Sequence, residues 1–334
     1  MKPRQYGAAL LSAMLTVTLV ATFAAAALWQ QYRSIEVEAS ERARVQVAWL
    51  LVGALDWSRL ILRIDGRAGT TDFLAEPWAV PLQEARLSTF LAADKNNTGG
   101  MTAEESLDAF LSGSMVDAQS KLNVFNLIQD GKTSEADLAT FSKLFTQLSL
   151  PANELLTLML NLKAALDVTP NSNSASGAAP LMPQRVRQLT WLGLSPNTVN
   201  KLSPYITLIP QRTTLNINTA SAVVLYAAVP DFQLVDANAV VSARESKHFE
   251  TMDDATKRFP GFTSKLSTNP YSVKTDFFDV TGRIRLEQIV VEEHSLVQRD
   301  ANRDVKTLWR ERAVVASPES STNASSATSP TSLQ

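Results

Sequence analysis

The strongest pattern in the chain is an uncharged, mostly apolar run near its start. Two basic residues, Lys2 and Arg4, precede 28 residues without charge, from Gln5 to Tyr32. The apolar part, Ala8 to Trp29, is long enough to cross a bilayer as a helix, because about 20 residues span a hydrocarbon core of about 30 Å. Basic flanks remain on the cytoplasmic side. The pattern therefore predicts a membrane helix at 8–29, a cytoplasmic N-terminus and the bulk of the chain across the membrane.

A helical pattern continues beyond the apolar run. Apolar residues recur at steps of three and four, while charged residues fall on another face. The apolar positions are Leu50, Ala54, Trp57, Ile61 and Ile64. The expected stop is Asp65-Gly66. We therefore expect one helix of about 55 residues, apolar all round in its first half and amphipathic in its second.

Strands are predicted at both ends of the remaining chain, with helices between them. The expected strands are 86–91, 110–116, a short one from Leu122, 277–286, 288–297 and 306–314, with a hairpin turn at 300–304. The expected helices are 136–148, 153–166, 186–192 and 222–228, with a loop at 169–180. This order indicates an α+β chain in which a helical segment interrupts a sheet.

The expected organisation follows from this order of elements. Residues 30–125 and 266–316 are predicted to form one sheet domain with the long helix, and residues 126–265 an inserted, mainly helical domain. The tail 317–334 consists almost entirely of Ser, Thr, Ala, Asn and Pro, which predicts disorder.

Composition removes several classes of function. The chain has 334 residues, a net charge of −2 and no cysteine, which excludes disulfides, cysteine zinc sites and thiol chemistry. The charge balance gives no general attraction to nucleic acid. The two histidines, His248 and His294, are far apart in sequence, and no phosphate loop, nucleophile elbow or paired-histidine metal motif occurs. Nothing in the sequence argues for an enzyme.

The apolar run has three interpretations. It fits a simple membrane anchor, and Ala24 to Ala27 also offer the small residues of a secretory cleavage site. The third interpretation starts from Gly7, because the apolar run begins at the next residue, Ala8, without a polar spacer. This order resembles a type IV prepilin leader, residues 1–7, which implies cleavage between Gly7 and Ala8 and retention of the helix. Ser12 stands at mature position five, where most pilins carry a glutamate.

The stretch Leu215-Asn-Ile-Asn-Thr-Ala-Ser221 resembles the opening of a helix-hairpin-helix unit. In DNA-binding versions a glycine-rich hairpin presents backbone amides to phosphate. Here the hairpin reads Val229-Pro-Asp-Phe232, without glycine and with the acidic Asp231, and no basic cluster compensates. We therefore interpret the unit as a protein-packing module and expect no nucleic acid as a partner.

One segment has the spacing of a calcium loop. Asp94, Asn96, Thr98 and Glu105 could supply oxygen ligands around Gly99, with Glu105 at the twelfth position of the loop. However, aspartate is missing at the third and fifth positions, and strands are expected to flank the segment. Calcium is thus a possible ligand here, and a solvated hairpin loop is the competing interpretation.

Taken together, these features resemble the type II secretion system minor pseudopilin K family, also called general secretion pathway protein K. The matching features are the leader, the long helix, the interrupted sheet, Glu76-Pro77-Trp78, Leu122-Asn123-Val124 and the stretch from Leu215 to Ser221. Ser12 fits too, since this family lacks the glutamate of other pseudopilins. The resemblance implies a pilin-like fold, in which the long N-terminal helix packs on an antiparallel sheet interrupted by the helical insertion.

The resemblance also implies a role. It predicts a single-pass inner-membrane subunit at the tip of a periplasmic pseudopilus, which initiates or caps the filament and supports export of folded proteins. The implied partners are minor pseudopilins I and J, the prepilin peptidase, the inner-membrane assembly platform and secreted substrates. Two alternatives stay open: a minor pilin of a type IV pilus or DNA-uptake system, and a membrane-anchored periplasmic binding domain.

Overall fold

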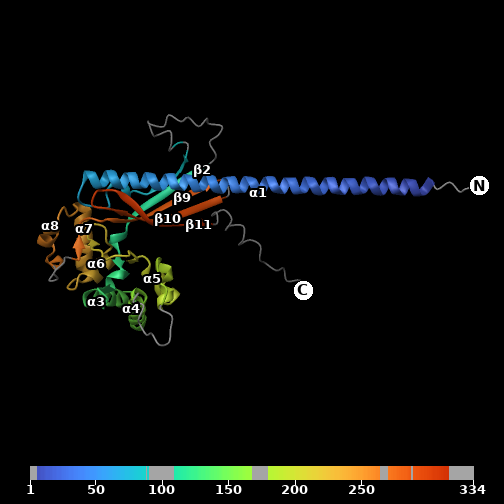
Figure 1. Cartoon of the computed structure of the whole chain (residues 1–334). Coiled ribbons are helices and arrows are strands. Elements are labelled where there is room, and N and C mark those ends of the chain that lie inside the picture. Colours follow the sequence, from blue (N-terminus) through green and yellow to red (C-terminus); the bar gives the residue numbers. More distant parts are fainter. Residues whose placement is uncertain are drawn as a thin grey trace, which may run out of the picture.

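The computed structural model describes residues 6–87, 89, 109–167, 180–263, 270–286 and 289–315. Its dominant element is helix α1, Tyr6–Ala68, which continues without a break from the apolar run into the folded part (Figure 1). Its first part projects alone, with Leu10, Leu15 and Phe23 all more than half exposed. Among the described residues, one helix is long and apolar enough to cross a membrane, and it is α1. The prediction of one long N-terminal helix is confirmed.

The second half of α1 lies on a five-stranded antiparallel sheet. The strand order is β1-β2-β9-β10-β11, with bounds Leu82–Arg86, Ala109–Asp117, Phe277–Leu286, Ile289–Arg299 and Val305–Val315. Val47, Leu51, Leu55 and Leu62 of α1 are buried against it at helical spacing. Burying four such side chains stabilises the pairing of helix and sheet by roughly 6–12 kcal/mol before entropy is subtracted. The α+β fold class is therefore confirmed.

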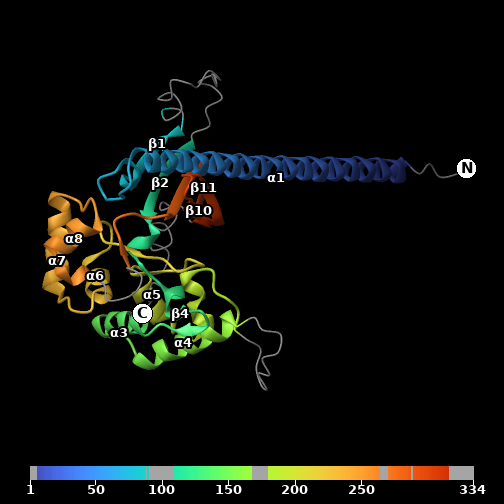
Figure 2. The ribbon, with the colours of Figure 1, turned by 60° about the vertical axis from the view of Figure 1, so that its left-hand side comes forward.

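Beyond β2 the chain builds a helical lobe, defined here as residues 122–263, which lies on the side of the sheet away from α1 (Figures 1 and 2). Its α-helices are α3 Glu135–Gln147, α4 Ala152–Leu166, α5 Pro196–Leu202, α6 Ala222–Ala228, α7 Leu234–Ser246 and α8 Met252–Arg258. Its 3-10 helices are Val124–Leu127, Val186–Leu192 and Pro260–Phe262. Phe141, Leu158 and Leu189 belong to its largest apolar core.

In the described part of the chain, six very short strands, in three pairs, lie within the helical lobe or link it to the segment that leads into β9. β3 (Leu122–Asn123) pairs in parallel with β6 (Ile206–Thr207), and β7 (Leu215–Asn216) pairs in parallel with β8 (Tyr271–Ser272). β4 (Ile128–Gln129) and β5 (Lys132–Thr133) form a tight hairpin. Its turn, Asp130-Gly131, has positive φ at both residues, as a two-residue hairpin with an Asp-Gly turn requires.

Helix starts follow local capping chemistry. Ser134, Ser195, Ser221 and Thr251 each accept a backbone N–H from the residue three positions on, at the N-termini of α3, α5, α6 and α8. Pro196 stands at the first position of α5, where its missing N–H costs nothing. The expected helices at 136–148, 153–166 and 222–228 are thus confirmed, and the expected helix at 186–192 is a 3-10 helix.

One strand prediction is wrong. The expected strand 86–91 is β1 at Leu82–Arg86, and Leu87 is already helical. Arg86, the last residue of β1, pairs with Phe110 near the start of β2. The expected short strand from Leu122 is confirmed as β3, and it ends after two residues because the Asn123 side chain accepts the Phe125 N–H and caps a 3-10 helix. The C-terminal strands and their turn are confirmed, since Asp300 N–H donates to the Asp304 carbonyl.

Candidate functional site

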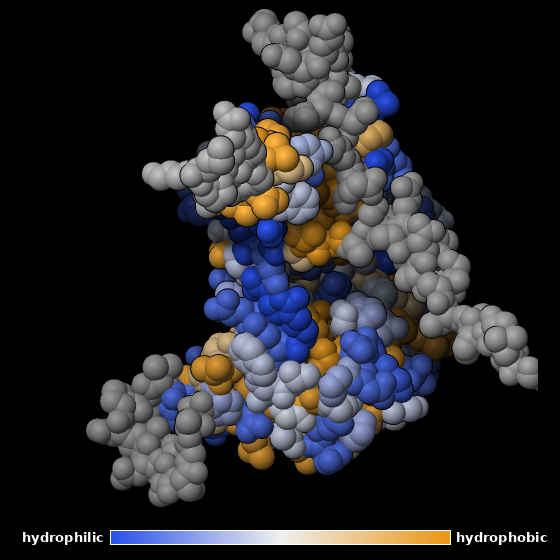
Figure 3. Space-filling view, turned by 90° about the vertical axis from the view of Figure 1, so that its right-hand side faces the viewer, coloured by the Kyte–Doolittle hydropathy of each residue, from blue (hydrophilic) through white to orange (hydrophobic). Residues whose placement is uncertain are grey.

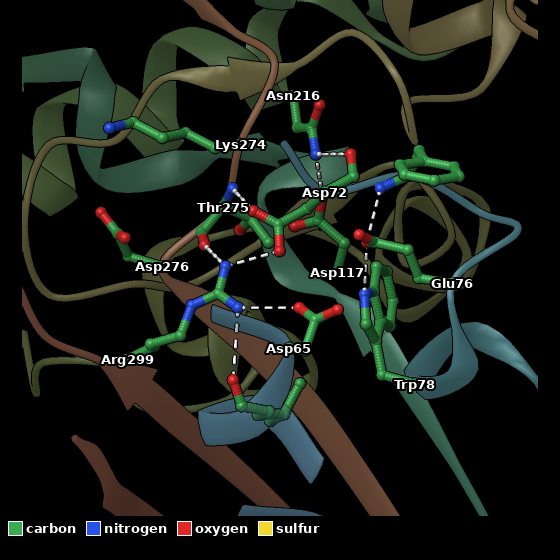
Figure 4. Close-up of polar contacts among 12 residues, drawn as sticks. Asp65, Asp72, Glu76, Trp78, Asp117, Asn216, Lys274, Thr275, Asp276 and Arg299 are labelled. Carbon is green, nitrogen blue, oxygen red and sulfur yellow. Dashed lines mark hydrogen bonds and ion pairs between the residues drawn. The ribbon is translucent and has the colours of Figure 1, made fainter. Parts of the chain in front are cut away.

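The stretch Leu215 to Ser221 lies where the helical lobe meets the sheet. Asn216, fully buried, donates its amide to Asp117 Oδ2 at 2.9 Å and to the Asp72 carbonyl at 3.1 Å. The Thr219 hydroxyl donates to the same carboxylate oxygen. Asp117 ends strand β2, so these contacts join the helical lobe to the sheet (Figure 4).

Asn218, two residues on, faces the helical lobe instead. Its amide nitrogen donates to the Phe249 carbonyl at 3.0 Å, and its oxygen accepts the Phe249 N–H at 2.9 Å. Arg244 donates to the Ile217 carbonyl at 2.7 Å. The two asparagines therefore fasten the same short segment to both sides, which explains an Asn-x-Asn spacing in an otherwise apolar stretch.

Asn123 plays a similar part at the other end of the lobe. Its side chain accepts the Ile209 N–H at 3.1 Å and donates to the carbonyls of Ile209 and Gln211 at 3.0 and 2.7 Å. In both the Leu122 motif and the Leu215 motif, the asparagine side chains therefore form hydrogen bonds with buried backbone groups. Such groups cost stability when they lack a partner in the interior, so these side chains specify one arrangement of the lobe.

The third motif, Glu76-Pro77-Trp78, belongs to an acidic cluster at the end of α1. Carboxylate oxygens of Asp65, Asp72 and Glu76 all lie within 4.8 Å of one another. Glu76 Oε2 accepts the Trp78 indole N–H at 2.7 Å and the Phe73 N–H at 2.9 Å. Trp78 itself is 1% exposed and packs edge-on against a ring of β9.

Arg299, at the end of β10, supplies the positive charge of this cluster. Its guanidinium donates to Asp65 Oδ2 at 2.9 Å, to Asp72 Oδ1 and to the Thr275 carbonyl at 2.9 Å (Figure 4). Asp72 Oδ2 in turn accepts the Thr275 N–H. The guanidinium is therefore the positive charge that balances Asp65 and Asp72. Its ion pairs join the end of α1, the loop that follows it and strand β10.

Burial changes the acidity of this region. Burial raises the pKa of Glu76 to about 7, against the two N–H groups that it accepts. Burial likewise raises the pKa of Asp117 to about 6, against hydrogen bonds from Thr219, Thr275 and Asn216. It also raises the pKa values of Asp65 and Asp276. These carboxyl groups therefore bind protons more readily in the folded chain than in the unfolded chain.

We name this set of contacts the junction: Asp65, Asp72, Glu76, Asp117, Asn216, Thr219, Thr275 and Arg299. The sequence did not point to its charged members apart from Glu76. The sequence did contain one signal for Arg299. Side chains alternate between the two faces of a strand, and Arg299 lies on the same face of β10 as the buried Val291 and Val297. A charge on the buried face of a strand requires a partner.

The helix-hairpin-helix-like unit consists of α6, the turn Val229–Phe232 and α7. Lys143 Nζ of α3 donates to the carbonyls of Val229, Pro230 and Phe232 at 3.0, 3.2 and 2.8 Å, and lies 4.2 Å from the centre of the Tyr226 ring. The hairpin backbone is therefore engaged by a side chain of the same lobe, as a packing module requires.

A long apolar groove runs between α1 and the β1–β2 edge of the sheet. It encloses about 820 Å³ and is lined by Trp49, Trp57 and Leu60 of α1, by Val80, and by Leu111 and Met115 of β2, among others. Trp49 is 71% exposed and Leu60 47% exposed. Exposed apolar surface of this kind marks an interaction site. Elsewhere, in the view of Figure 3, hydrophilic residues gather in a band between the upper and lower parts of the molecule.

The remaining sequence-predicted site residues lie near the start of α1 or outside the described residues. Gly7 and Ala8 belong to the first turn of α1. Ser12 is exposed and donates its hydroxyl to the Ala9 carbonyl at 2.9 Å, so its polar group is satisfied within the helix. Asp94, Asn96, Thr98 and Glu105, the predicted calcium ligands, lie outside the described residues.

Comparison with known proteins points to one family. Two family models described as "Type II secretion system (T2SS), protein K" match residues 120–211 and 215–274, the second beginning at the Leu215 stretch. The chain is similar to the type II secretion system protein K family. The protein of this name from Pseudomonas aeruginosa is 26% identical over 335 residues, which cover 93% of this chain and 94% of that protein.

A solved structure shares the fold. A chain in the crystal structure of the GspK-GspI-GspJ complex from the type 2 secretion system of enterotoxigenic Escherichia coli matches 82% of this chain and 98% of its own length. The TM-score is 0.62 at 19% sequence identity. The chain described here is accordingly a minor pseudopilin, a structural component of its secretion system, with an apolar helix suited to membrane anchoring.

Proposed function

We propose that this minor pseudopilin stands at the tip of the type II secretion pseudopilus, where it initiates or caps the filament and supports export of folded proteins. The observation that carries the proposal is the placement of the helical lobe. The lobe extends sideways from the sheet, opposite α1, and widens the subunit greatly (Figure 2). A filament shaft packs subunits around a bundle of N-terminal helices, which leaves little room for such a lobe, whereas the tip has free space.

We further propose that the partners are minor pseudopilins I and J, as in the E. coli complex whose protein K chain has this fold. The apolar groove supports this. The groove follows α1. The N-terminal helix of a neighbouring subunit anchored in the same membrane would run alongside α1, so its apolar face could lie in this groove. Trp49, Trp57 and Leu60 are the side chains of α1 that such a helix would cover.

Processing and topology complete the proposal. The prepilin peptidase cuts between Gly7 and Ala8, the assembly platform draws the mature helix from the inner membrane, and the part after Arg33 is periplasmic. Ser12 supports the position at the tip, because it is uncharged and bonded within its own helix and so offers no carboxylate to the amine of a subunit above it. A structural role without catalysis is part of this proposal.

A deletion strain complemented with variants tests the proposal. The chain should restore exoprotein release, and Trp57→Glu with Leu60→Glu should abolish both release and co-purification with pseudopilins I and J. Leu160→Glu, which changes an exposed leucine of α4 outside the groove, is the matched control and should behave as wild type. Normal release in the deletion strain, with loss of twitching or transformation, would instead establish the chain as a minor pilin of a type IV pilus or DNA-uptake system.

A further inference from the structure

The loop between α1 and the 3-10 helix Pro77–Ala79 is held from three sides. Asp72 N–H donates to the Val273 carbonyl at 3.0 Å, and the Asp72 carbonyl accepts from Asn216 of the helical lobe. Phe73 stacks on His248 of the lobe with ring centres 3.7 Å apart. Movement of this loop would therefore disturb the attachment of the helical lobe to α1 and the sheet.

Around this loop, acidic side chains outnumber the basic side chains that bond to them. Asp65, Asp72 and Glu76 lie within 4.8 Å of one another, and Arg299 bonds to the first two. Among the described residues no cation bonds to Glu76, whose hydrogen-bond donors are a backbone N–H and an indole N–H. Three carboxylates therefore share one guanidinium, and the charge on Glu76 is not compensated.

Carboxylate oxygens of Asp65 and Glu76 lie within 4.8 Å of each other, close enough for small movements to bring them into hydrogen-bond contact. Two ionised carboxylates offer only acceptors, so a hydrogen bond between them needs a proton on one of them. The same arrangement, two carboxyl groups too close to ionise together, raises proton affinity wherever it occurs.

The other charged groups around the loop do not supply the missing positive charge. They are Asp117 at the end of β2, Lys274 and Asp276 before β9, Arg303 in the turn after β10, and His248 against Phe73. Lys274 and Arg303 act on Asp276, whereas the charges that act on Glu76 are those of Asp65 and Asp72, both negative.

We propose that Asp65 and Glu76 share one proton in the closed junction, and that loss of this proton above neutral pH releases the loop 69–76 and loosens the helical lobe from the sheet. The subunit thus carries a proton-sensitive lock between its two halves. Burial, which raises the pKa of Glu76 to about 7, agrees with this geometry.

The direction of the effect follows from linkage. The closed form holds the proton up to a pH of about 7, whereas an open loop releases it near the ordinary pKa value of 4.5. The advantage that the proton gives the closed form is therefore complete below pH 4.5 and is lost progressively as pH rises to about 7. Between pH 6 and pH 8 the equilibrium constant for local opening should rise about tenfold.

Two measurements on the full chain in detergent micelles test the lock. The indole N–H of Trp78 donates to Glu76, so its nitrogen chemical shift reports the ionisation of that carboxyl group. After assignment with Trp78→Phe, the wild-type signal should titrate near neutral pH, and Glu76→Gln should abolish the titration. Hydrogen exchange, corrected for intrinsic rates, should show the tenfold rise in opening of 69–80 in wild type and none in Glu76→Gln.

Controls make each outcome decisive. Glu245→Gln, at an exposed position of α7, should titrate and open as wild type does. If Glu76→Gln fails to fold, Asp65→Asn serves instead, and it should lower the Trp78 midpoint by removing the neighbouring acid. A wild-type midpoint below pH 5, or equal opening at both pH values, overturns the proposal. So does a midpoint that shifts between added calcium and chelator, since a metal ion would then occupy the place of the proton.

Discussion

Arg299→Met is the sharpest perturbation of the junction. The side chain is 3% exposed, and its guanidinium donates to Asp65, to Asp72 and to the carbonyls of Leu62 and Thr275. Methionine keeps much of the apolar stem but removes all four of these contacts. Because Asp65 and Asp72 stay buried without a counter-charge, the substitution should lower the free energy of unfolding by about 3–5 kcal/mol at pH 8.

The size of this loss should depend on pH. Without the guanidinium, the clustered carboxyl groups bind protons more readily in the folded state, since three acids then face one another. Stability gained by such proton uptake is present at low pH and disappears as pH rises, so the loss should be smaller at pH 5.5 than at pH 8. Arg299→Lys keeps the positive charge but lacks the several N–H donors of the guanidinium, so its stability should lie between those of wild type and Arg299→Met.

Pulse proteolysis of the full chain in detergent, across a urea series at both pH values, measures these losses. Arg310→Met, at an exposed position of the edge strand β11, is the matched control and should change stability by less than about 0.5 kcal/mol. A loss below about 1 kcal/mol for Arg299→Met, or an equal loss at both pH values, would contradict the argument that the guanidinium balances buried carboxylates.

Three further predictions test packing and backbone. Leu62→Ala, at a fully buried position of α1, should cost about 2–5 kcal/mol, whereas Leu60→Ala, in the groove, should leave stability unchanged and weaken only partner co-purification. Gly193→Ala should destabilise the lobe by more than about 1 kcal/mol, because φ is +94° and the new Cβ would lie 2.5 Å from the Thr157 side chain. Gly53→Ala is its control: the new Cβ would have no atom within 4 Å, so thermal melts should show a slight stabilisation of α1. Asn216→Ala should cost about 1–3 kcal/mol in urea unfolding, because it removes the amide donor to buried acceptors; no measurable loss would contradict that role.

Much of the fold could be predicted from the sequence because its periodicities are long and consistent. Helix α1 and strands β9 to β11 each keep one pattern over ten residues or more. Helix α7 went unplaced because its buried face uses small or atypical residues, Ala237, Val240 and Arg244, which give little periodic signal. β1 was misplaced because its extent depends on where β2 begins, and such pairing is not visible in a local window.

The junction was less accessible for a related reason. Asn216 and Asn218 could be noticed as a motif, but their partners, Asp117 and the Phe249 backbone, are about 100 and about 30 residues away. Asp65 and Arg299 come from opposite ends of the folded part. A single sequence does not show which distant charges meet, so the ion-paired cluster appeared only with the fold.

The mature N-terminus shows whether the membrane helix of this pseudopilin is cut at its cytoplasmic end and kept. Intact-mass and N-terminal peptide mass spectrometry should be performed on the protein purified from membranes of a strain with an active prepilin peptidase. We expect a mature chain that begins at Ala8. A chain that begins near Leu28, as after secretory cleavage, or one that retains Met1 to Gly7, would contradict it.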